Sequence, residues 1–316
     1  MKHLLILLLL ISCLFNRSDA QILGVNQPLF SDLPFFNTEF IKVNRIQSII
    51  GSISSKKVQD IIRSKGLQSE YTFNEDGTLN RQLSSILSQQ KKDTTITYYE
   101  YNKLGNIELQ RKSDGEGFFS YHYQYNSKQQ IVAQTYCRDE NLHQAKNRFE
   151  LKKKYTIKTE RFSYENYGDE QTKKIFYNSY GIKFKEQTNS FDKLGYLKEE
   201  YTKFIIGNNK QKVNYEYDEY GRRFKKDIFT NISLNQKNTE IYSYDEIGNV
   251  IGINYYKNEK HTTTKQFLYD TKTMLLSAII VQEIDTHFLT IIKYDYTFFD
   301  GSTNITPLNK LSLNEP

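Results

Sequence analysis

The sequence has 316 residues, of which 38 % are hydrophobic and 25 % are charged, and its formal net charge is +6. The 43 Lys and Arg are spread over the whole length and form no recognisable nucleic-acid-binding module, so we expect no nucleic-acid partner. The apolar surface comes largely from 25 Tyr and 20 Phe, and only 4 Pro and 15 Gly are present, which favours an ordered, strand-rich chain and excludes a disordered one.

Residues 1–20 have the pattern of a secretory signal peptide. A basic start precedes an apolar run from Leu4 to Phe15, and the small residues Ser18 and Ala20 are suited to cleavage after Ala20. The run is shorter than the roughly 20 apolar residues that a membrane span requires. We therefore expect an exported chain that is secreted or periplasmic.

A second interpretation concerns Cys13. The stretch Leu10-Ile-Ser-Cys13 resembles a bacterial lipobox, in which the cysteine becomes the lipidated first residue. Lipidation of Cys13 is the alternative to cleavage after Ala20, and it would give an outer-membrane lipoprotein that meets the membrane only through its lipid anchor. If Cys13 leaves with the signal, Cys137 is alone and no internal disulfide can form.

The next stretch, 21–66, reads as an irregular lead-in. It contains two of the four prolines, and the segment 56–66 places apolar residues at helical spacing before Gly66. The spacing predicts one short helix there. The repeated part of the chain then extends over 67–301, and the tail 302–316 is predicted to be flexible.

The clearest example of the repeated unit is "YEYDEYGRRF" at 215–224. Asp218 is suited to begin a type I turn, because its carboxylate can accept backbone hydrogen bonds, and Gly221 can take the left-handed conformation that closes the turn. Asp245 and Gly248 stand in the same positions of "YSYDEIGNVI" at 242–251. The unit therefore predicts a β-hairpin with structural turns at these residues.

Turns of this kind recur along the chain. Their Asp or Asn lies at positions 74, 102, 126, 192, 218, 245 and 270, mostly 24 to 28 residues apart, and "YNSYG" at 177–181 is displaced by about half a period. A second set of turns between them gives two strands per period and about fifteen strands from Glu70 to Phe299. We predict an all-β fold: a wide antiparallel meander of repeated hairpins, curled or closed into an open barrel-like sheet.

The units at 215–222 and 242–249 resemble the YD repeats of the RHS family, whose repeats form long β-sheet ribbons that spiral into shells. The chain is too short to enclose a cargo and lacks a following toxin domain, so the resemblance implies a repeated sheet without encapsulation. The sequence also resembles, more loosely, secreted bacterial proteins of unknown function with a porin-like β-sheet. Neither resemblance implies an activity.

The sequence offers few candidates for chemistry, and we expect no catalytic, cofactor-binding or metal-binding residue. The histidines of the mature chain are scattered without metal-ligand spacing, and the Asp-x-x-Gly turns lack the alternating oxygen ligands of a calcium loop. The main irregularity in the repeat is the segment 138–154, which is the first place to look for a site.

Two functions follow from these observations. The first is an exported β-repeat protein of the cell envelope or extracellular space with a binding or structural role and no catalysis, whose partner is a surface polymer or another envelope protein. The alternative is a hydrolase that acts on an extracellular or envelope polymer through carboxylates on one edge of the sheet. Tyr-rich strand faces favour the first, because such rings are rigid amphipathic contact surfaces.

Overall fold

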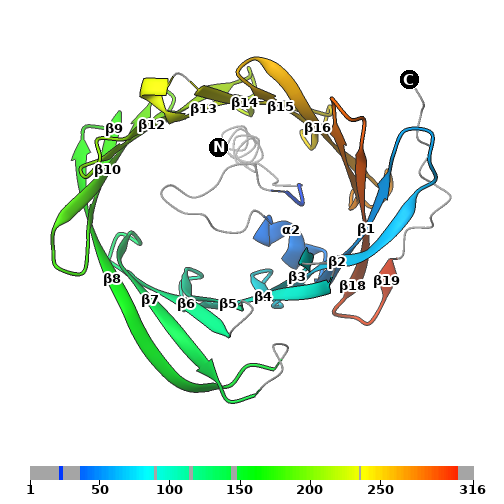
Figure 1. Ribbon diagram of the computed structural model, residues 1–316, viewed down its shortest axis with the longest axis horizontal. Helices are drawn as coiled ribbons and strands as arrows, with labels where there is room; N and C mark the ends of the chain where they lie inside the picture. Colours follow the sequence, from blue (N-terminus) through cyan, green and yellow to red (C-terminus); the bar gives the residue numbers. More distant parts are fainter. Residues whose placement is uncertain are drawn as a thin grey trace, which may run out of the picture.

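The computed structural model describes residues 21–23, 36–88, 91–113, 117–143, 148–234 and 236–304. The predicted signal peptide, Cys13, and the predicted tail beyond residue 304 lie outside these residues. The described chain forms a ring of antiparallel strands, seen end-on in Figure 1, with one α-helix inside the ring.

The elements follow the sequence alternation of apolar and polar residues. The first ten in chain order are α2 (Thr38–Val43), β1 (Ile46–Lys56), β2 (Arg63–Phe73), β3 (Leu79–Ser88), β4 (Lys91–Tyr101), β5 (Ile107–Ser113), β6 (Phe118–Tyr125), β7 (Ile131–Asn141), β8 (Leu151–Tyr167) and β9 (Gln171–Tyr177). The remainder are β10 (Lys183–Phe191), β11 (Leu197–Phe204), β12 (Lys210–Tyr217), β13 (Arg223–Asn231), the 3-10 helix η1 (Ile232–Leu234), β14 (Gln236–Tyr244), β15 (Val250–Lys257), β16 (Lys260–Tyr269), β17 (Leu276–Glu283), β18 (Leu289–Phe298) and β19 (Thr303–Asn304).

The sheet closes on itself between its first and eighteenth strands. Each strand from β2 to β17 pairs with its two neighbours in the chain, and β1 pairs antiparallel with both β2 and β18. Gly51 of β1 lies opposite Tyr294 of β18 and Ser69 of β2. The all-β fold and its antiparallel meander are therefore confirmed, and the curl predicted for so wide a sheet is a complete closure into an 18-stranded barrel.

The two sets of turns lie at opposite ends of the barrel. The connections after β2, β4, β6, β10, β12, β14 and β16 are the Asx turns at 74, 102, 126, 192, 218, 245 and 270, and all lie at one end, which we call the Asx-turn rim. The turn at 178 joins β9 to β10, so it lies at the other end. This position explains its displacement by half a period, since the long strand β8 reaches the Asx-turn rim at a different turn, 168–170.

The helix is not where helical spacing predicted it. Segment 56–66 holds the end of β1, a connection and the start of β2, and Ser55 pairs with Arg63 to close a hairpin. Val58 and Ile61 are 58 % and 70 % exposed, so the predicted helix would have had no surface to pack on. The first strand therefore begins at Ile46, inside the stretch expected to be irregular, and β2 to β18 make seventeen strands where about fifteen were expected.

The helix that does form is α2, which lies inside the ring beside residues 21–23 (Figure 1). The Asn37 side chain caps it by accepting hydrogen bonds from the backbone N–H groups of Glu39 and Phe40. Phe40 and Ile41 are buried in the main core, which also contains Ile22, Leu23 and inward-facing residues of β1 to β5 and β14 to β18. We call residues 21–23 and 36–44 the plug, because they fill one side of the barrel interior.

Candidate functional site: the inner wall of the barrel

Alternation along each strand decides which side chains face the interior. Tyr242 belongs to the same buried core as the plug residues, so Glu240, two residues earlier on β14, also faces inward. Lys226 of β13 lies opposite Glu240 and is on the inner face, whereas its neighbour Lys225 contacts Glu216 on the outer face. Adjacent lysines of β13 therefore point to opposite sides of the barrel wall.

A recurring hydrogen bond ties the inner face together at the Asx-turn rim. The tyrosine immediately before the turn residue donates its hydroxyl to the backbone carbonyl of the first residue of the preceding strand: Tyr217 to Leu197 at 2.8 Å and Tyr244 to Arg223 at 2.6 Å. The same bond is made by Tyr101, Tyr125 and Tyr269 to Leu79, Ile107 and Val250. Each repeat is thereby joined to the one before it, which explains why tyrosine recurs beside the turn.

Two carboxylates on the inner wall are held by tyrosine hydroxyls. Glu200 of β11 accepts from Tyr215 at 2.7 Å and from the side-chain amide of Gln187 at 3.1 Å. Glu240 accepts from Tyr242 at 2.6 Å, and the ammonium of Lys226 lies 3.6 Å away. These side chains form a polar belt on β10 to β14.

Burial shifts the pKa values of tyrosines in this belt and of two neighbouring side chains on β15 and β16. Burial, with the nearby Glu240 carboxylate, raises the pKa of Tyr255 on β15 to about 12. Burial also raises the pKa values of Tyr215 and Tyr242, each beside its glutamate. Conversely, burial lowers the pKa of Lys265 on β16, and the charge of Glu240 opposes that shift. The tyrosines of the belt are hydrogen-bond donors at neutral pH.

Next to Glu200 lies a polar side chain without a partner. Asn189 of β10 is opposite both Glu200 and Thr172, and its side chain is 0 % exposed. Within the described part of the chain, neither amide atom of Asn189 nor the hydroxyl of Thr172 has a hydrogen-bond partner. Buried polar groups of this kind are normally paired with ordered water or a ligand.

Further along the wall, from β6 to β10, cations lie over aromatic rings. The guanidinium of Arg138 lies 4.4 Å from the centre of the Phe119 ring, and the ammonium groups of Lys174 and Lys185 lie 4.1 Å and 3.7 Å from Phe162 and Phe176. Tyr136 stacks on both Phe119 and Tyr121, with ring centres 5.3 Å and 4.9 Å apart. This part of the wall combines apolar rings with positive charge.

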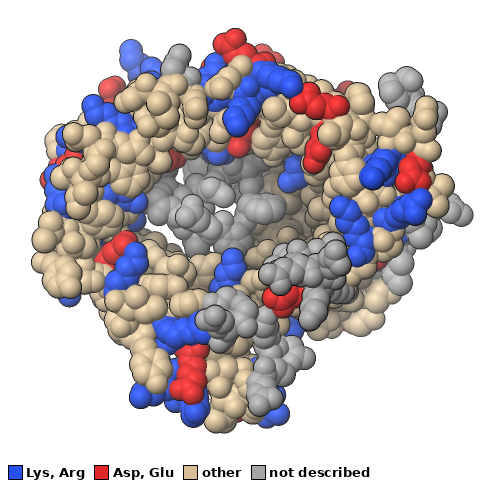
Figure 2. Space-filling view, viewed as in Figure 1, with Lys and Arg blue, Asp and Glu red and all other residues tan. Residues whose placement is uncertain are grey.

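The view down the barrel shows this interior as a hollow. Figure 2 shows the ring open towards its centre on the side of β8 to β13, with charged side chains of both signs around its outside. The plug packs against the opposite side of the wall. The inner wall from β7 to β13 contributes no residue to this core and is the part of the described interior that the plug does not cover.

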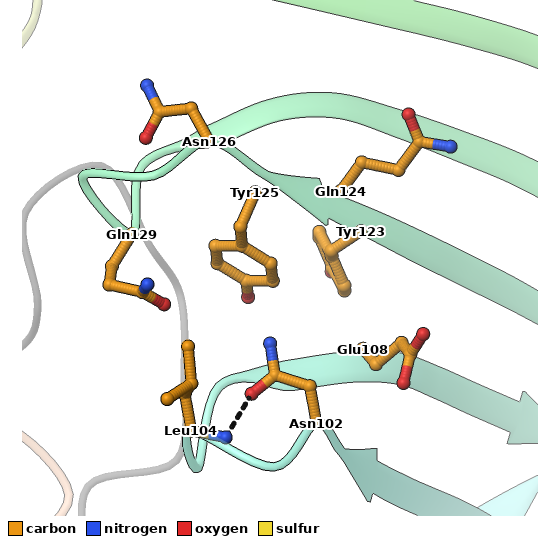
Figure 3. A pocket seen from close by; sticks show the side chains of 8 residues that line it. All are labelled: Asn102, Leu104, Glu108, Tyr123, Gln124, Tyr125, Asn126 and Gln129. Carbon is orange, nitrogen blue, oxygen red and sulfur yellow. Dashed lines mark hydrogen bonds between the residues drawn. The ribbon is translucent and has the colours of Figure 1, made fainter.

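A smaller pocket of about 370 Å³ lies at the Asx-turn rim, between the turns at 102 and 126 (Figure 3). Its lining comprises Asn102, Leu104, Glu108, Tyr123, Gln124, Tyr125, Asn126 and Gln129. Asn106 donates to the Gln129 side chain at 2.6 Å and so connects the two turns, and the hydrogen bond from Leu104 to Asn102 drawn in Figure 3 belongs to the turn itself. These polar groups form hydrogen bonds within and between the two turns.

A buried polar cluster lies on the outer face, near the turn end of the β7–β8 hairpin. The Arg111 guanidinium donates to the Asp139 carboxylate at 2.7 Å, and the Phe149 ring covers Arg111 at 4.1 Å. Cys137 is a free, fully buried thiol beside them, 3.8 Å from the Thr156 hydroxyl. Burial lowers the pKa of the nearby His122, and the charge of Lys154 adds to that shift. The cluster holds the turn end of the β7–β8 hairpin on the outer face and does not face the interior.

The predicted turn residues lie at the Asx-turn rim and not in the belt. One carboxylate oxygen of Asp218 accepts from the N–H groups of Tyr220 and Arg222, and Gly221 has φ +74°. Asp245 accepts from Ile247 and Asn249 in the same way, and Gly248 has φ +94°.

The scattered histidines stay apart. His143 lies 2.9 Å from Glu150, and His261 stacks on Tyr256 with ring centres 4.8 Å apart. Among the described residues, no group of three or more His, Cys, Asp and Glu side chains could hold a metal ion. The polar belt was missed by sequence reasoning, because nothing in the local pattern marks Glu200 or Glu240 among the many other glutamates.

Comparisons with known proteins give no family. No family model matches the chain, and no curated protein matches it. In the described part of the chain, no helix has the length and hydrophobicity needed to cross a membrane.

Solved structures with a related arrangement include porin-like proteins of Bacteroides. That from Bacteroides uniformis is 11 % identical, with 80 % of this chain and 97 % of that chain covered and a TM-score of 0.39. That from Bacteroides vulgatus is 10 % identical, with 76 % and 96 % covered and a TM-score of 0.31. A chain of the Photorhabdus luminescens Tc holotoxin pore is 10 % identical over 73 % of this chain and 19 % of that one, with a TM-score of 0.18.

Proposed function

We propose that this chain is an exported, non-catalytic binding protein of the cell envelope or extracellular space that holds an anionic amphipathic ligand inside its barrel. The observation that carries the proposal is the inner wall from β7 to β13 with the neighbouring Phe119 of β6, where aromatic rings and cations line the side of the interior that the plug leaves uncovered. Ligand sites combine such apolar surface with a few placed polar groups.

The chemistry of the wall indicates the ligand class. An apolar or ring-shaped part would pack on Phe119, Tyr121 and Tyr136, and an acidic group would be attracted by cations such as Arg138 and Lys226. These groups lie on a closed sheet, so they are held in place without a lid.

The outer wall supports an aqueous location for this ligand carrier. Outward-facing residues of β11 to β13 form cross-strand ion pairs, with Lys212 and Glu199 3.4 Å apart and Lys225 and Glu216 2.7 Å apart. A wall that faced lipid would carry an apolar band instead. The proposal therefore places the ligand in the interior and water outside.

Binding of an anionic amphipathic dye, anilinonaphthalene sulfonate, tests the proposal. Lys226→Gln removes an inward charge and Lys225→Gln removes its outward neighbour, so the two variants are a matched pair. We expect Lys226→Gln to weaken dye binding about tenfold and Lys225→Gln to leave it within about twofold, with decanoate displacing the dye. Equal affinities in the two variants, or dye binding that does not saturate, would refute the interior site. Denaturant midpoints of both variants check that each is folded.

Export is tested separately by mass spectrometry of the mature protein. The apolar run from Leu4 to Phe15, followed by Ser18 and Ala20, leads us to expect a chain that starts at Gln21, with a lipid on Cys13 as the alternative. An intact Met1 on protein recovered outside the cytoplasm contradicts both forms of processing.

A further inference from the structure

Strand β8 has an unpaired edge over part of its length. β8 extends over Leu151–Tyr167, but its pairing with β9 covers only Arg161 to Tyr167. Residues 151–160 pair with β7 on one side alone, and among the described residues no strand pairs with them on the other. Figure 1 shows this end of the β7–β8 hairpin extending away from the ring.

The edge is exposed over residues 151–158. Every residue from Leu151 to Lys158 is exposed, including Tyr155 at 46 % and Ile157 at 53 %. At its inner end the Ser179 hydroxyl accepts from the backbone N–H of Thr159 at 2.9 Å and donates to its carbonyl at 3.1 Å. The backbone of Thr159 is thus hydrogen-bonded by the Ser179 side chain. No described side chain makes such hydrogen bonds on this edge at 151–158.

Charge decides which strand could pair there. The segment 151–160 contains four lysines and one glutamate, and Lys152 is paired to Glu140 across the hairpin at 2.7 Å. Antiparallel pairing of two copies over this segment would place Lys153 opposite Lys158, and like charges directly opposite each other across a strand pair are destabilising. Lysine on an edge prevents such self-pairing. An acidic strand has no such penalty.

We propose that the β8 edge at 151–160 is a docking site for an extended acidic segment of another protein, which adds to the sheet as a strand. Its backbone pairs with the free edge, and its acidic side chains meet the face that carries Lys153 and Lys158 beside Tyr155. Its apolar side chains lie on the opposite face of the added strand. This surface is on the outside of the barrel, so it is independent of the interior site.

A labelled peptide of about ten residues that alternates Glu and Val serves as the probe, with binding to the mature protein followed by fluorescence anisotropy. We expect saturable binding that Lys153→Glu weakens about tenfold, whereas Lys203→Glu has little effect. Lys203 is a matched control, because it is exposed on β11, which has a strand on both sides.

Two N-methylated peptides separate strand addition from simple charge attraction. Methylation of every second amide blocks one hydrogen-bonding edge of the peptide and leaves its charges unchanged, so one of the two isomers should lose about tenfold in affinity and the other should bind like the parent. Hydrogen exchange should slow at 151–158 when the peptide binds. Equal binding of both isomers, absence of saturable binding, or dimerisation of the protein through this edge would overturn the proposal.

Discussion

Among single residues, the glycines at the fourth position of the Asx turns at 218 and 245 hold the left-handed conformation. Gly221 and Gly248 have φ +74° and +94°, a region in which a β-carbon is strained. A β-carbon on Gly221 would also lie 2.1 Å from the Tyr196 hydroxyl, and one on Gly248 would lie 2.7 Å from the Gln21 amide nitrogen. We expect Gly→Val at either position to reduce the free energy of unfolding by about 1–3 kcal/mol.

Gly252 provides the comparison with the same substitution. It lies within β15 without a positive φ, and a β-carbon there would lie 3.2 Å from the Ser243 hydroxyl and at ordinary contact distance, 3.8 Å, from the Lys265 backbone oxygen. Gly252→Val should therefore be mild, because a β-branched residue suits a pleated strand. Denaturant midpoints measure all three variants, and equal losses at the three sites would show that turn conformation is not the cause.

The tyrosine before the turn gives a second prediction at this scale. Tyr217→Phe keeps the ring and removes the hydroxyl that donates to the Leu197 carbonyl, so we expect a loss of about 1 kcal/mol in the free energy of unfolding. Tyr220→Phe is the control, because that ring is 71 % exposed at the tip of the same turn. If urea midpoints of the two variants agree, the inter-repeat hydrogen bond contributes nothing measurable.

At the scale of elements, the plug depends on a close approach between α2 and the turn after β2. A β-carbon on Gly77 would lie 2.1 Å from the backbone oxygen of Thr38, in the first turn of α2. Gly105 has the same place in the next Asx turn with φ +79°, and a β-carbon there would have no neighbour within 4 Å. The two glycines share the backbone strain but differ in the contact.

We therefore expect Gly77→Ala to displace the plug and Gly105→Ala to leave it docked. Both variants should lose about 1 kcal/mol from the left-handed backbone, and Gly77→Ala should lose more. Limited proteolysis within residues 36–45 and hydrogen exchange of α2 report on docking directly. Equal protection of α2 in the two variants would mean that the helix does not rely on this contact.

The hairpins could be predicted from the sequence, whereas the positions of the helix and of β1 could not. The hairpins could be predicted because a turn depends on a few adjacent residues, such as Asp218 and Gly221, whose chemistry is local. The helix predicted over 56–66 failed because apolar spacing forms a helix only when another surface buries it, and Val58 remains exposed. The strand β1 was missed because no Asx turn precedes it to mark its start.

The inner belt could not be predicted for a different reason. Alternation assigns Tyr215 and Glu216 to opposite faces, but which face is inside depends on closure between β1 and β18, strands more than 200 residues apart in sequence. Only after closure do Glu200 and Glu240, from separate hairpins, face the same interior. The composition predicted strands with aromatic faces, and the closure of the sheet determined that those faces line the interior.

At the scale of the whole molecule, closure removes the sheet edges that a wide meander would expose. The backbone N–H and C=O groups of β1 and β18 pair with each other along most of both strands. Residues 151–160 of β8 keep an open edge. The plug then supplies a core on one side of a ring that is otherwise too wide for its own side chains to fill. The barrel is therefore stabilised by pairing all round its wall and by apolar packing on one side.

The same architecture makes stability depend on alkaline pH. Burial raises the pKa values of many inward-facing tyrosines in the same direction: Tyr71, Tyr99, Tyr101, Tyr125, Tyr164, Tyr215, Tyr217, Tyr242, Tyr244, Tyr255, Tyr269, Tyr294 and Tyr296. For Tyr164, Tyr244 and Tyr255 the pKa rises from 10.0 to about 12. The folded state thus keeps protons that the unfolded chain loses.

The sign of the effect follows from that difference. Below the unfolded pKa of about 10 both states are protonated and stability is full, and above it the unfolded state binds fewer protons, so stability falls as the pH rises towards 12. Urea midpoints should be flat below pH 10 and then fall steeply, and tyrosinate absorbance should appear together with unfolding. Tyr244→Phe should make the fall shallower by up to about 1.4 kcal/mol per pH unit, because one shifted group is removed. Full tyrosine ionisation near pH 10 in a protein that stays folded would show that the rings are not buried against the wall.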